Sequence, residues 1–335
     1  MRPRICLTHL GGGGADSRGM APWVEQDAQI LGASYDVRPF LYRSKRSVVA
    51  LTADLLSASL SLNWFAWDNA RWSVRLGKFL KVAAIVVVAG FDVADEPQLG
   101  YGAMRTARGR AKVRSILEGA AHVFALSNFV RLSAQDVSPH VPVELLPLGF
   151  NSSAFPPGPE PRQREAICTV GDVTESNLAR KGIGDVIEVA RYLDKTPVFI
   201  VGQISPSLRT IVDRAPKNVS FLGYVPQETL LRIFHKSRVY MQLSRHEGFG
   251  SSLAEAMLCR CVPVVSKAGS LPEVVGETGY STVLGQPERI AEVVFRAMSD
   301  WAGGDAARER IKTTFPLSRR RDRLLRRVGE LASHR

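Results

Sequence analysis

The chain has 335 residues, of which 45% are hydrophobic and 23% are charged, as expected for a globular protein with one large or two ordinary domains. Its longest apolar runs, such as residues 82–89, are far shorter than the roughly 18 to 20 residues of a membrane-spanning helix. The basic N-terminus lacks a long apolar segment and a small-residue cleavage site, so we expect no signal peptide and a cytoplasmic location.

Short apolar, β-branched runs alternate along the chain with stretches of helical spacing. This alternation predicts an α/β fold with parallel sheets. The expected strands cover residues 5–10, 85–89, 123–126, 166–170, 198–201, 239–243 and 262–265.

A stretch rich in proline and glycine at residues 147–161 interrupts this pattern. It predicts a linker between two doubly wound, Rossmann-like domains, at residues 1–150 and 162–314, that face a central cleft. Residues 315–335 are expected to form a terminal amphipathic helix that packs back on the N-terminal domain. Leucines and Val328 line one face of this helix, and a solvated face is expected to carry Arg319, Arg320, Arg323, Arg326 and Arg327.

The net charge of +12 is concentrated in two places. Residues 105–114 contain five basic and no acidic residues, and residues 302–335 contain ten basic and four acidic residues. A focal excess of this kind predicts an anionic partner, for which we consider a membrane surface and a lipid-linked or polyanionic substrate. A nucleic-acid-binding protein stays an alternative, although neither stretch contains the interleaved aromatic residues typical of that class.

The four cysteines, Cys6, Cys168, Cys259 and Cys261, lack the C-x-x-C spacing of redox and zinc sites. We expect buried free thiols.

Two glutamates flank a Gly-Phe-Gly turn in the second predicted domain. Glu247 follows the strand at 239–243, where sites gather in parallel sheets, and Glu255 lies eight positions later. Gly248 and Gly250 allow close backbone approach, and a helix that begins near Ser251 offers free N–H groups to an anion. An anion with an attached polyol would suit this arrangement. Alternatively, the spacing from Ser252 to Glu255 fits a helix-capping box.

The run E-G-F-G-S-S-L-A-E-A-M resembles the E-x7-E signature of the family 4 retaining glycosyltransferases, which have the GT-B fold. The segments T-V-G-D, R-K-G-I-G-D-V-I-E-V-A, V-S-F-L-G-Y-V and G-F-D-V-A-D-E-P-Q-L-G-Y-G extend the similarity. The resemblance implies transfer of a sugar from a UDP- or GDP-linked donor to a hydroxyl acceptor, with retained anomeric configuration. That acceptor is expected to be lipid-linked or a growing glycan, and the enzyme is expected to lie in the cytoplasm or on the inner face of the membrane.

The resemblance also implies roles for individual residues. Glu255 would bind the ribose hydroxyls, Glu247 the donor sugar, and Lys181 the leaving diphosphate, with Asp92 contacting the acceptor or capping a loop. The remaining donor contacts and the phosphate or acceptor loop would come from Gly248, Phe249, Gly250, Ser251, Ser252, Arg180, Tyr224 and Val225, and from Gly12, Gly13 and Gly14.

Two departures from the family pattern stand out. Asp172 occupies the position of an arginine that usually accompanies the lysine, so Arg180 is a candidate substitute. Ala89 occupies the position of a histidine that usually precedes the Gly-x-Asp segment, which rules out acceptor activation by that histidine. There is no D-x-D segment, so we expect no metal ion and no cofactor apart from the donor substrate. A retaining glycosidase and a nucleotide-sugar epimerase are the alternative enzymes.

Overall fold

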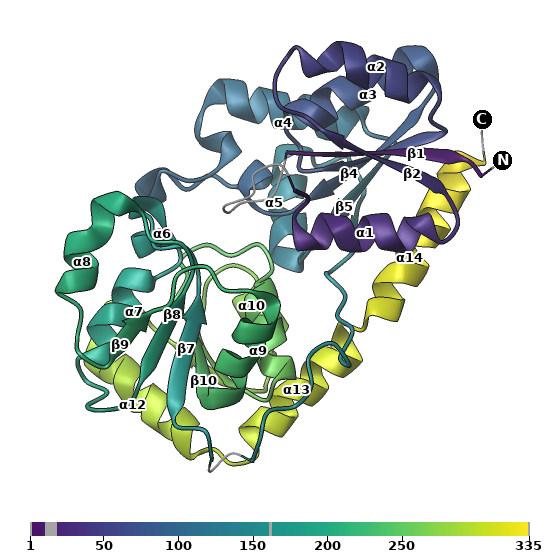
Figure 1. Cartoon of the computed structure of the whole chain (residues 1–335). Helices are drawn as coiled ribbons and strands as arrows, with labels where there is room; N and C mark the ends of the chain where they lie inside the picture. Colours follow the sequence, from purple (N-terminus) through teal and green to yellow (C-terminus); the bar gives the residue numbers. More distant parts are fainter. Residues whose placement is uncertain (1, 11–18, 161–162, 334–335) are drawn as a thin grey trace. The chain divides into compact units, whose positions relative to one another are not determined.

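The computed structural model describes residues 2–10, 19–160 and 163–333 (Figure 1). The contacts within the chain divide it into two compact units. Unit 1 comprises Met1–Gly149 together with Leu317–Arg335, and unit 2 comprises Phe150–Pro316. The division between residues 149 and 150 lies within the stretch that is rich in proline and glycine. The glycine loop Gly12 to Gly14 lies outside the described residues.

Unit 1 is built on a six-stranded sheet in which every described pairing is parallel. The strand order is β2-β1-β3-β4-β5-β6. The strands are β1 (Arg4–His9), β2 (Asp36–Leu41), β3 (Leu60–Trp64), β4 (Ala83–Val88), β5 (His122–Ala125) and β6 (Val143–Leu145).

Helices connect these strands because parallel neighbours need a crossover. Apolar residues of α3, α4 and α5 pack against β4 and β5 in one core cluster, and α2 packs in another with Cys6. The helices of unit 1 are α1 (Pro22–Gly32), α2 (Ser47–Leu56), α3 (Asp68–Leu80), α4 (Ala107–Gly119), α5 (Asn128–Val137) and α14 (Leu317–Ala332). Three short 3-10 turns, η1 (Phe91–Val93), η2 (Pro97–Leu99) and η3 (Ala103–Arg105), follow β4.

Unit 2 repeats this design with the strand order β12-β11-β10-β7-β8-β9, again with parallel pairings. Its strands are β7 (Ala166–Val170), β8 (Val198–Val201), β9 (Val219–Phe221), β10 (Ser237–Gln242), β11 (Val262–Ser266) and β12 (Tyr280–Thr282). Its helices are α6 (Glu175–Arg180), α7 (Ile183–Ala190), α8 (Arg209–Asp213), α9 (Gln227–Lys236), α10 (Ser251–Leu258), α11 (Leu271–Val275), α12 (Pro287–Ser299) and α13 (Gly303–Thr314), with a 3-10 turn η5 (Pro206–Leu208).

The predicted parallel α/β architecture is confirmed, and each expected strand is present to within two residues at either end. The prediction of buried free thiols is also confirmed for all four cysteines. Among the helices of the described residues, none is both long and apolar enough to cross a bilayer.

The expected solvated arginine face of the terminal helix is wrong for Arg320. This side chain is buried in unit 1, where α14 lies beside α1 (Figure 1). It forms a two-pronged ion pair with Asp27, with both N–O distances 2.8 Å, and donates to the carbonyls of Leu146 and Pro147 at 2.9 Å. Arg327 pairs with Glu144 at 2.8 Å. The helix is therefore held by arginines as well as by leucines.

The basic stretch at residues 105–114 is also less available than its charge suggests. Arg110 pairs with Asp95, and Lys112 pairs with Asp68 at 3.0 Å. Arg114 donates to a backbone carbonyl, that of Val137, at 3.0 Å. Three of these five basic side chains are thus paired with a carboxylate or hydrogen-bonded to the backbone within unit 1. The stretch is therefore not simply a cationic patch that is free to bind an anionic partner.

Candidate functional site

Glu247 sits in a polar cluster just beyond the carboxyl end of β10. Its Oε2 atom accepts hydrogen bonds from Lys181 Nζ at 2.5 Å and from Gln242 Nε2 at 2.7 Å, and lies 3.4 Å from Ser244 Oγ. The exposed fraction of the side chain is 11% for Glu247 and 22% for Lys181. The structure therefore brings together two residues that lie 66 positions apart in the sequence.

The electrostatics of this cluster keep Glu247 ionised. Burial alone would raise the pKa of Glu247, but the positive charge and the hydrogen bond of Lys181 outweigh it, and the pKa is lowered from its ordinary value. An ionised carboxylate can accept hydrogen bonds from hydroxyl groups. Lys181 keeps further N–H donors beyond the one used by Glu247, because an ammonium group has three.

The backbone around Lys181 is fixed by close packing against the loop after β10. Gly182, the N-cap of α7, has a φ of 68°, and a Cβ there would lie 2.0 Å from the carbonyl oxygen of Leu243. Only glycine fits this approach. Next to it, Arg245 donates its backbone N–H to the carbonyl of Arg180 at 2.8 Å and pairs with Asp185 at 2.6 Å.

The Gly-Phe-Gly turn leads directly into α10, as predicted. Gly250 is the N-cap residue, with a φ of 89° and without a side-chain cap, so the capping box from Ser252 to Glu255 is wrong. Ser251 and Ser252 are in the first turn, where backbone N–H groups have no acceptor within the helix. Phe249 is buried against Phe150 and Phe315, with ring centroids 6.0 and 5.3 Å away. The turn thus leaves a rigid helix N-terminus able to receive an anion.

Glu255 lies on α10 and is partly buried. Burial raises the pKa of Glu255 from 4.5 to about 7. The two glutamates of the motif therefore differ in charge near neutral pH, because Lys181 lowers the pKa of Glu247 whereas burial raises the pKa of Glu255.

We expect Glu255 to make the free energy of unfolding depend on pH. Between its unfolded pKa of 4.5 and its folded pKa of about 7, the native state binds more protons, so stability falls as the pH rises through this window and is level above it. Glu255→Gln should remove up to about 3 kcal/mol of this fall. Denaturant unfolding between about pH 5 and pH 8 measures the effect.

The matched control for this measurement is Glu277→Gln, because Glu277 is exposed. It should keep the wild-type pH profile. Parallel profiles for wild type and Glu255→Gln would show that Glu255 titrates at its ordinary value.

The other predicted donor contacts occupy more open positions in unit 2. Arg180 donates to Asn177 Oδ1 at 2.5 Å at the end of α6. Tyr224 is 70% exposed in the loop between β9 and α9, and Val225 follows it. Asp172, which replaces an arginine, accepts from the backbone N–H of Gln203 at 2.8 Å and so has a loop-holding role.

Asp92 lies in unit 1, and its geometry bears on the two roles considered for it, acceptor contact and loop capping. The residue is fully buried, and its carboxylate accepts from the backbone N–H groups of Ala66 at 2.9 Å, Ala89 at 3.1 Å and Gly90 at 2.9 Å. Burial raises the pKa of Asp92, and these hydrogen bonds oppose the rise. Of the two roles considered, loop capping is the one that the structure supports.

We expect Asp92→Ala to lower the stability of unit 1 by about 2 to 4 kcal/mol, since it leaves up to three backbone N–H groups buried without acceptors. Affinity for free nucleotide should stay at the wild-type level because the polar cluster around Glu247 lies in unit 2. A melting curve and a calorimetric titration with UDP and GDP test both statements. Unchanged stability would contradict the capping role.

The position of the Glu247 cluster follows from the sheet topology. In unit 2, β7 lies between β8 and β10, so connections leave the sheet in opposite directions from β7 and from β10. Parallel α/β sheets bind ligands at such a switch point, beyond the carboxyl ends of the strands. Glu247 follows β10, and Gly171 follows β7.

The comparisons with known proteins agree with this topology. Residues 158–314 match the sequence model of the family described as glycosyl transferases group 1. Unit 2 is a group 1 glycosyl transferase domain. Unit 1 and unit 2 together give the chain the GT-B fold. The structure matches sucrose-phosphate synthase from Thermosynechococcus elongatus with a TM-score of 0.81 over 100% of both chains, at 18% identity.

Two curated relatives of this GT-B protein are similar over shorter stretches, and a further solved structure matches nearly the whole chain. O-antigen chain mannosyltransferase B of Escherichia coli is 34% identical over 92 residues, which are 27% of this chain and 24% of the relative. N-acetyl-alpha-D-glucosaminyl L-malate synthase of Bacillus anthracis is 31% identical over 103 residues, 29% of this chain and 26% of the relative. The chain thus spans about a quarter of these curated relatives. Anabaena HepE in complex with UDP-glucose matches at a TM-score of 0.76 and 14% identity, over 98% of this chain and 99% of that one.

Sequence reasoning missed several residues of the cluster in this glycosyl transferase domain. Gln242 and Ser244 contact the Glu247 carboxylate, and Ser270 donates its N–H and its hydroxyl to the Glu247 carbonyl at 3.0 and 3.1 Å. Gln242 could have been predicted from the sequence, since a polar residue at the end of a parallel strand indicates a possible binding site. Ser270 was not, because it comes from the loop after β11.

Proposed function

We propose that the protein is a retaining glycosyltransferase that moves a sugar from a UDP- or GDP-linked donor to a hydroxyl acceptor without a metal ion. The observation that carries the proposal is the contact between Lys181 and Glu247 at the switch point of unit 2. It stands beside the free N-terminus of α10, so a cation, a carboxylate and backbone N–H groups converge where a sugar diphosphate presents matching chemistry.

In the proposed reaction, the bond between the anomeric carbon and the diphosphate breaks as a new bond to the acceptor oxygen forms on the same face of the sugar. The acceptor proton passes to the departing phosphate oxygen. Lys181 and the N–H groups of Ser251 and Ser252 stabilise the charge that grows on the diphosphate. Glu247 orients the sugar hydroxyls, and Glu255 holds the ribose.

Nucleotide release from a panel of UDP- and GDP-sugars tests the proposed donor, since slow donor hydrolysis reports it before the acceptor is known. Proton NMR of the first-formed glycoside then tests retention. We expect the donor's anomeric configuration in the product and full activity in the presence of a chelator. An inverted product would overturn the retaining mechanism, and loss of activity with the chelator would overturn metal independence.

The proposed acceptor is lipid-linked or a growing glycan, with the enzyme on the cytoplasmic face of a membrane. Three large apolar side chains on the neighbouring helices α2 and α3 support a peripheral position. They are Val49, Leu56 and Phe79, with exposed fractions of 80%, 60% and 85%. The exposed basic residues of the same region are Arg46, Arg75, Lys78 and Lys81, and each contributes on the order of 1 kcal/mol near an anionic leaflet.

Sedimentation with vesicles of phosphatidylglycerol and phosphatidylcholine tests this position. Binding at low salt that falls as salt rises is expected, and Val49→Ser with Phe79→Ser should weaken it. Equal sedimentation of the variant and the wild type would show that Val49 and Phe79 do not form the membrane contact.

A further inference from the structure

Lys181 lies in a tight turn between two helices, and an arginine from a different loop holds both sides of that turn. The helix α6 ends at Arg180, and α7 begins at Ile183. Arg245, in the loop between β10 and α10, donates its backbone N–H to the carbonyl of Arg180 at 2.8 Å and a guanidinium N–H to the carbonyl of Ala179 at 2.8 Å. Both carbonyls lie at the carboxyl end of α6, where they lack an α-helical partner.

The same guanidinium also reaches the start of α7. It forms a two-pronged ion pair with Asp185, with N–O distances of 2.6 and 3.2 Å, and Asp185 lies in the first turn of α7. A cation at the end of one helix and an acidic residue at the start of the next both match the helix dipoles. Arg245 therefore clamps the end of α6 to the start of α7, on either side of Lys181 in the sequence.

The clamp determines where the Lys181 ammonium group can lie, because a lysine side chain is flexible. The compact charge sits on a four-carbon stem, so its position depends on the backbone from which the stem starts. Lys181 Nζ lies 2.5 Å from Glu247 Oε2, and Glu247 follows Arg245 by two positions in the same loop. Arg245 thus ties the Lys181 turn to the loop that carries Glu247, and a misplacement of about 1 Å in such a site can cost about a hundredfold in rate.

The exposure of the ion pair indicates that it contributes little to stability. The exposed fraction of the side chain is 35% for Arg245 and 18% for Asp185, and ion pairs that water reaches add little to the free energy of unfolding. Its two-pronged geometry, by contrast, fixes the direction of the contact. The clamp is therefore suited to precise placement more than to stability.

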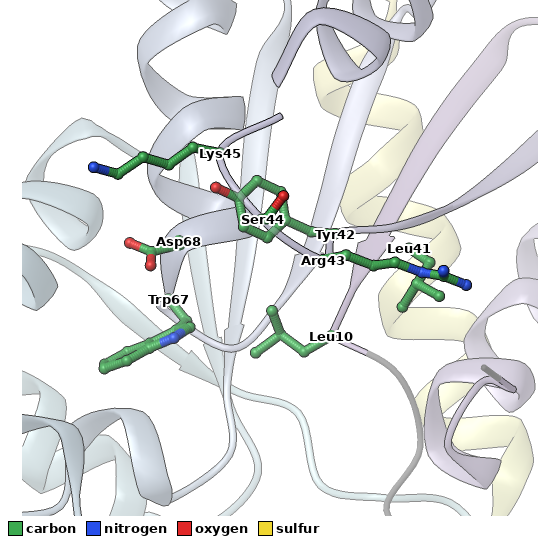
Figure 2. A pocket seen from close by; sticks show the side chains of 8 residues that line it. All are labelled: Leu10, Leu41, Tyr42, Arg43, Ser44, Lys45, Trp67 and Asp68. Carbon is green, nitrogen blue, oxygen red and sulfur yellow. The ribbon is translucent and has the colours of Figure 1, made fainter. Parts of the chain in front are cut away.

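Not every arginine in a loop beyond a strand is held in this way. In unit 1, Arg43 is exposed in the loop after β2 and extends from the wall of a cavity of about 880 Å³, away from Lys45 (Figure 2). Arg245 lies at a comparable place, three residues after β10, but its guanidinium is bound to protein groups of α6 and α7. Arg245 is therefore committed to the fold of its own site.

We propose that Arg245 is a positioning residue for Lys181. Its clamp on Asp185 and on the end of α6 keeps the Lys181 ammonium where negative charge grows on the leaving diphosphate. The inference deepens the proposed function and rests on it for its meaning in catalysis. The placement of Lys181 by Arg245 is a separate statement that can be measured without a reaction.

Nucleotide release by the full chain from a UDP- or GDP-sugar measures the effect on the reaction. Arg245→Ala should lower kcat by at least about tenfold, whereas its affinity for free UDP or GDP should change much less. Its melting temperature should stay within about 3 °C of the wild type. The matched control is Arg232→Ala, which removes an exposed pair with Glu228 at 2.7 Å and should keep the wild-type kcat.

A double-variant cycle distinguishes positioning from general damage. In the Lys181→Ala background, Arg245→Ala should change kcat by less than about twofold, since the group that it positions is already missing. Arg245→Lys keeps the charge but loses the planar two-pronged donor, so it should lower kcat much as Arg245→Ala does. An equally large loss in the absence of Lys181, or a wild-type kcat for Arg245→Lys, would overturn the inference.

NMR of isotope-labelled lysine ammonium groups follows Lys181 without catalysis. Its resonance is assigned by its absence in Lys181→Arg, and it should move in Arg245→Ala but not in Arg232→Ala. An unchanged Lys181 resonance in Arg245→Ala would contradict the clamp. Failure of the proposed function looks different, because the wild type would then release nucleotide from no sugar nucleotide, while the Lys181 resonance could still be measured.

Discussion

Lys181→Ala is expected to lower kcat for sugar transfer by about two to three orders of magnitude, the usual loss when one preorganised charge-stabilising contact is removed. The reason is that negative charge grows on the diphosphate only as the sugar bond breaks. The affinity for free UDP or GDP should change much less, because the nucleotide is held mainly through Glu255 in the proposed site. Steady-state kinetics and a calorimetric titration with the free nucleotide separate these two effects.

The same substitution leaves Glu247 without its cation, so a structural effect has to be distinguished from a catalytic one. The double variant Lys181→Ala/Glu247→Gln removes the unpaired charge and should recover stability but not kcat. Glu247→Gln alone should impair sugar positioning and leave nucleotide affinity near wild type. Lys195→Ala, an exposed lysine of unit 2, is the control. If Lys181→Ala keeps the wild-type kcat, Lys181 does not act on the leaving group.

The second large effect concerns stability. Arg320→Ala should lower the free energy of unfolding of unit 1 by about 3 to 5 kcal/mol, because it leaves the carboxylate of Asp27 buried without its partner. The exposed fractions of these side chains are 1% and 0%, and Trp64 also donates to Asp27 at 3.1 Å. Arg321→Ala is the matched control, since its pair with Asp322 is exposed, and it should change stability by less than about 0.5 kcal/mol.

Denaturant unfolding followed by tryptophan fluorescence suits this test, because Trp23, Trp64, Trp67 and Trp72 lie in unit 1 and Trp301 lies in unit 2. Similar unfolding midpoints for Arg320→Ala and Arg321→Ala would show that the buried pair contributes little.

The sequence alone was sufficient for features that depend on local pattern. A β-branched run buried on both faces, such as β4, can be recognised without its neighbours. The half-exposed edge strand β2 contains Pro39, and β3 contains Ser61 and Asn63, so both lack that pattern and were missed. The placement of Glu247 after a strand and of Lys181 at a helix start was predictable for the same local reason.

Features that depend on partners far away in the chain were not predictable. Arg320 and Asp27 are 293 positions apart, and no rule of helical spacing says which arginine of α14 will find a buried carboxylate. Asp92 shows the converse limit. Its residue type and loop position fit both an acceptor contact and a cap, and the three backbone N–H groups around its carboxylate, which favour the cap, become visible only in the structure.

Unit 1 is assembled from two separate parts of the chain, with all of unit 2 between them. On the ribosome, the residues of unit 2 are therefore complete before α14 has been synthesised. Until then, the Asp27 carboxylate has no guanidinium partner, and the first sheet lacks its last helix. The order of maturation is thus reversed relative to the usual expectation that the domain encoded first also folds first: unit 2 can finish folding while unit 1 still waits for α14.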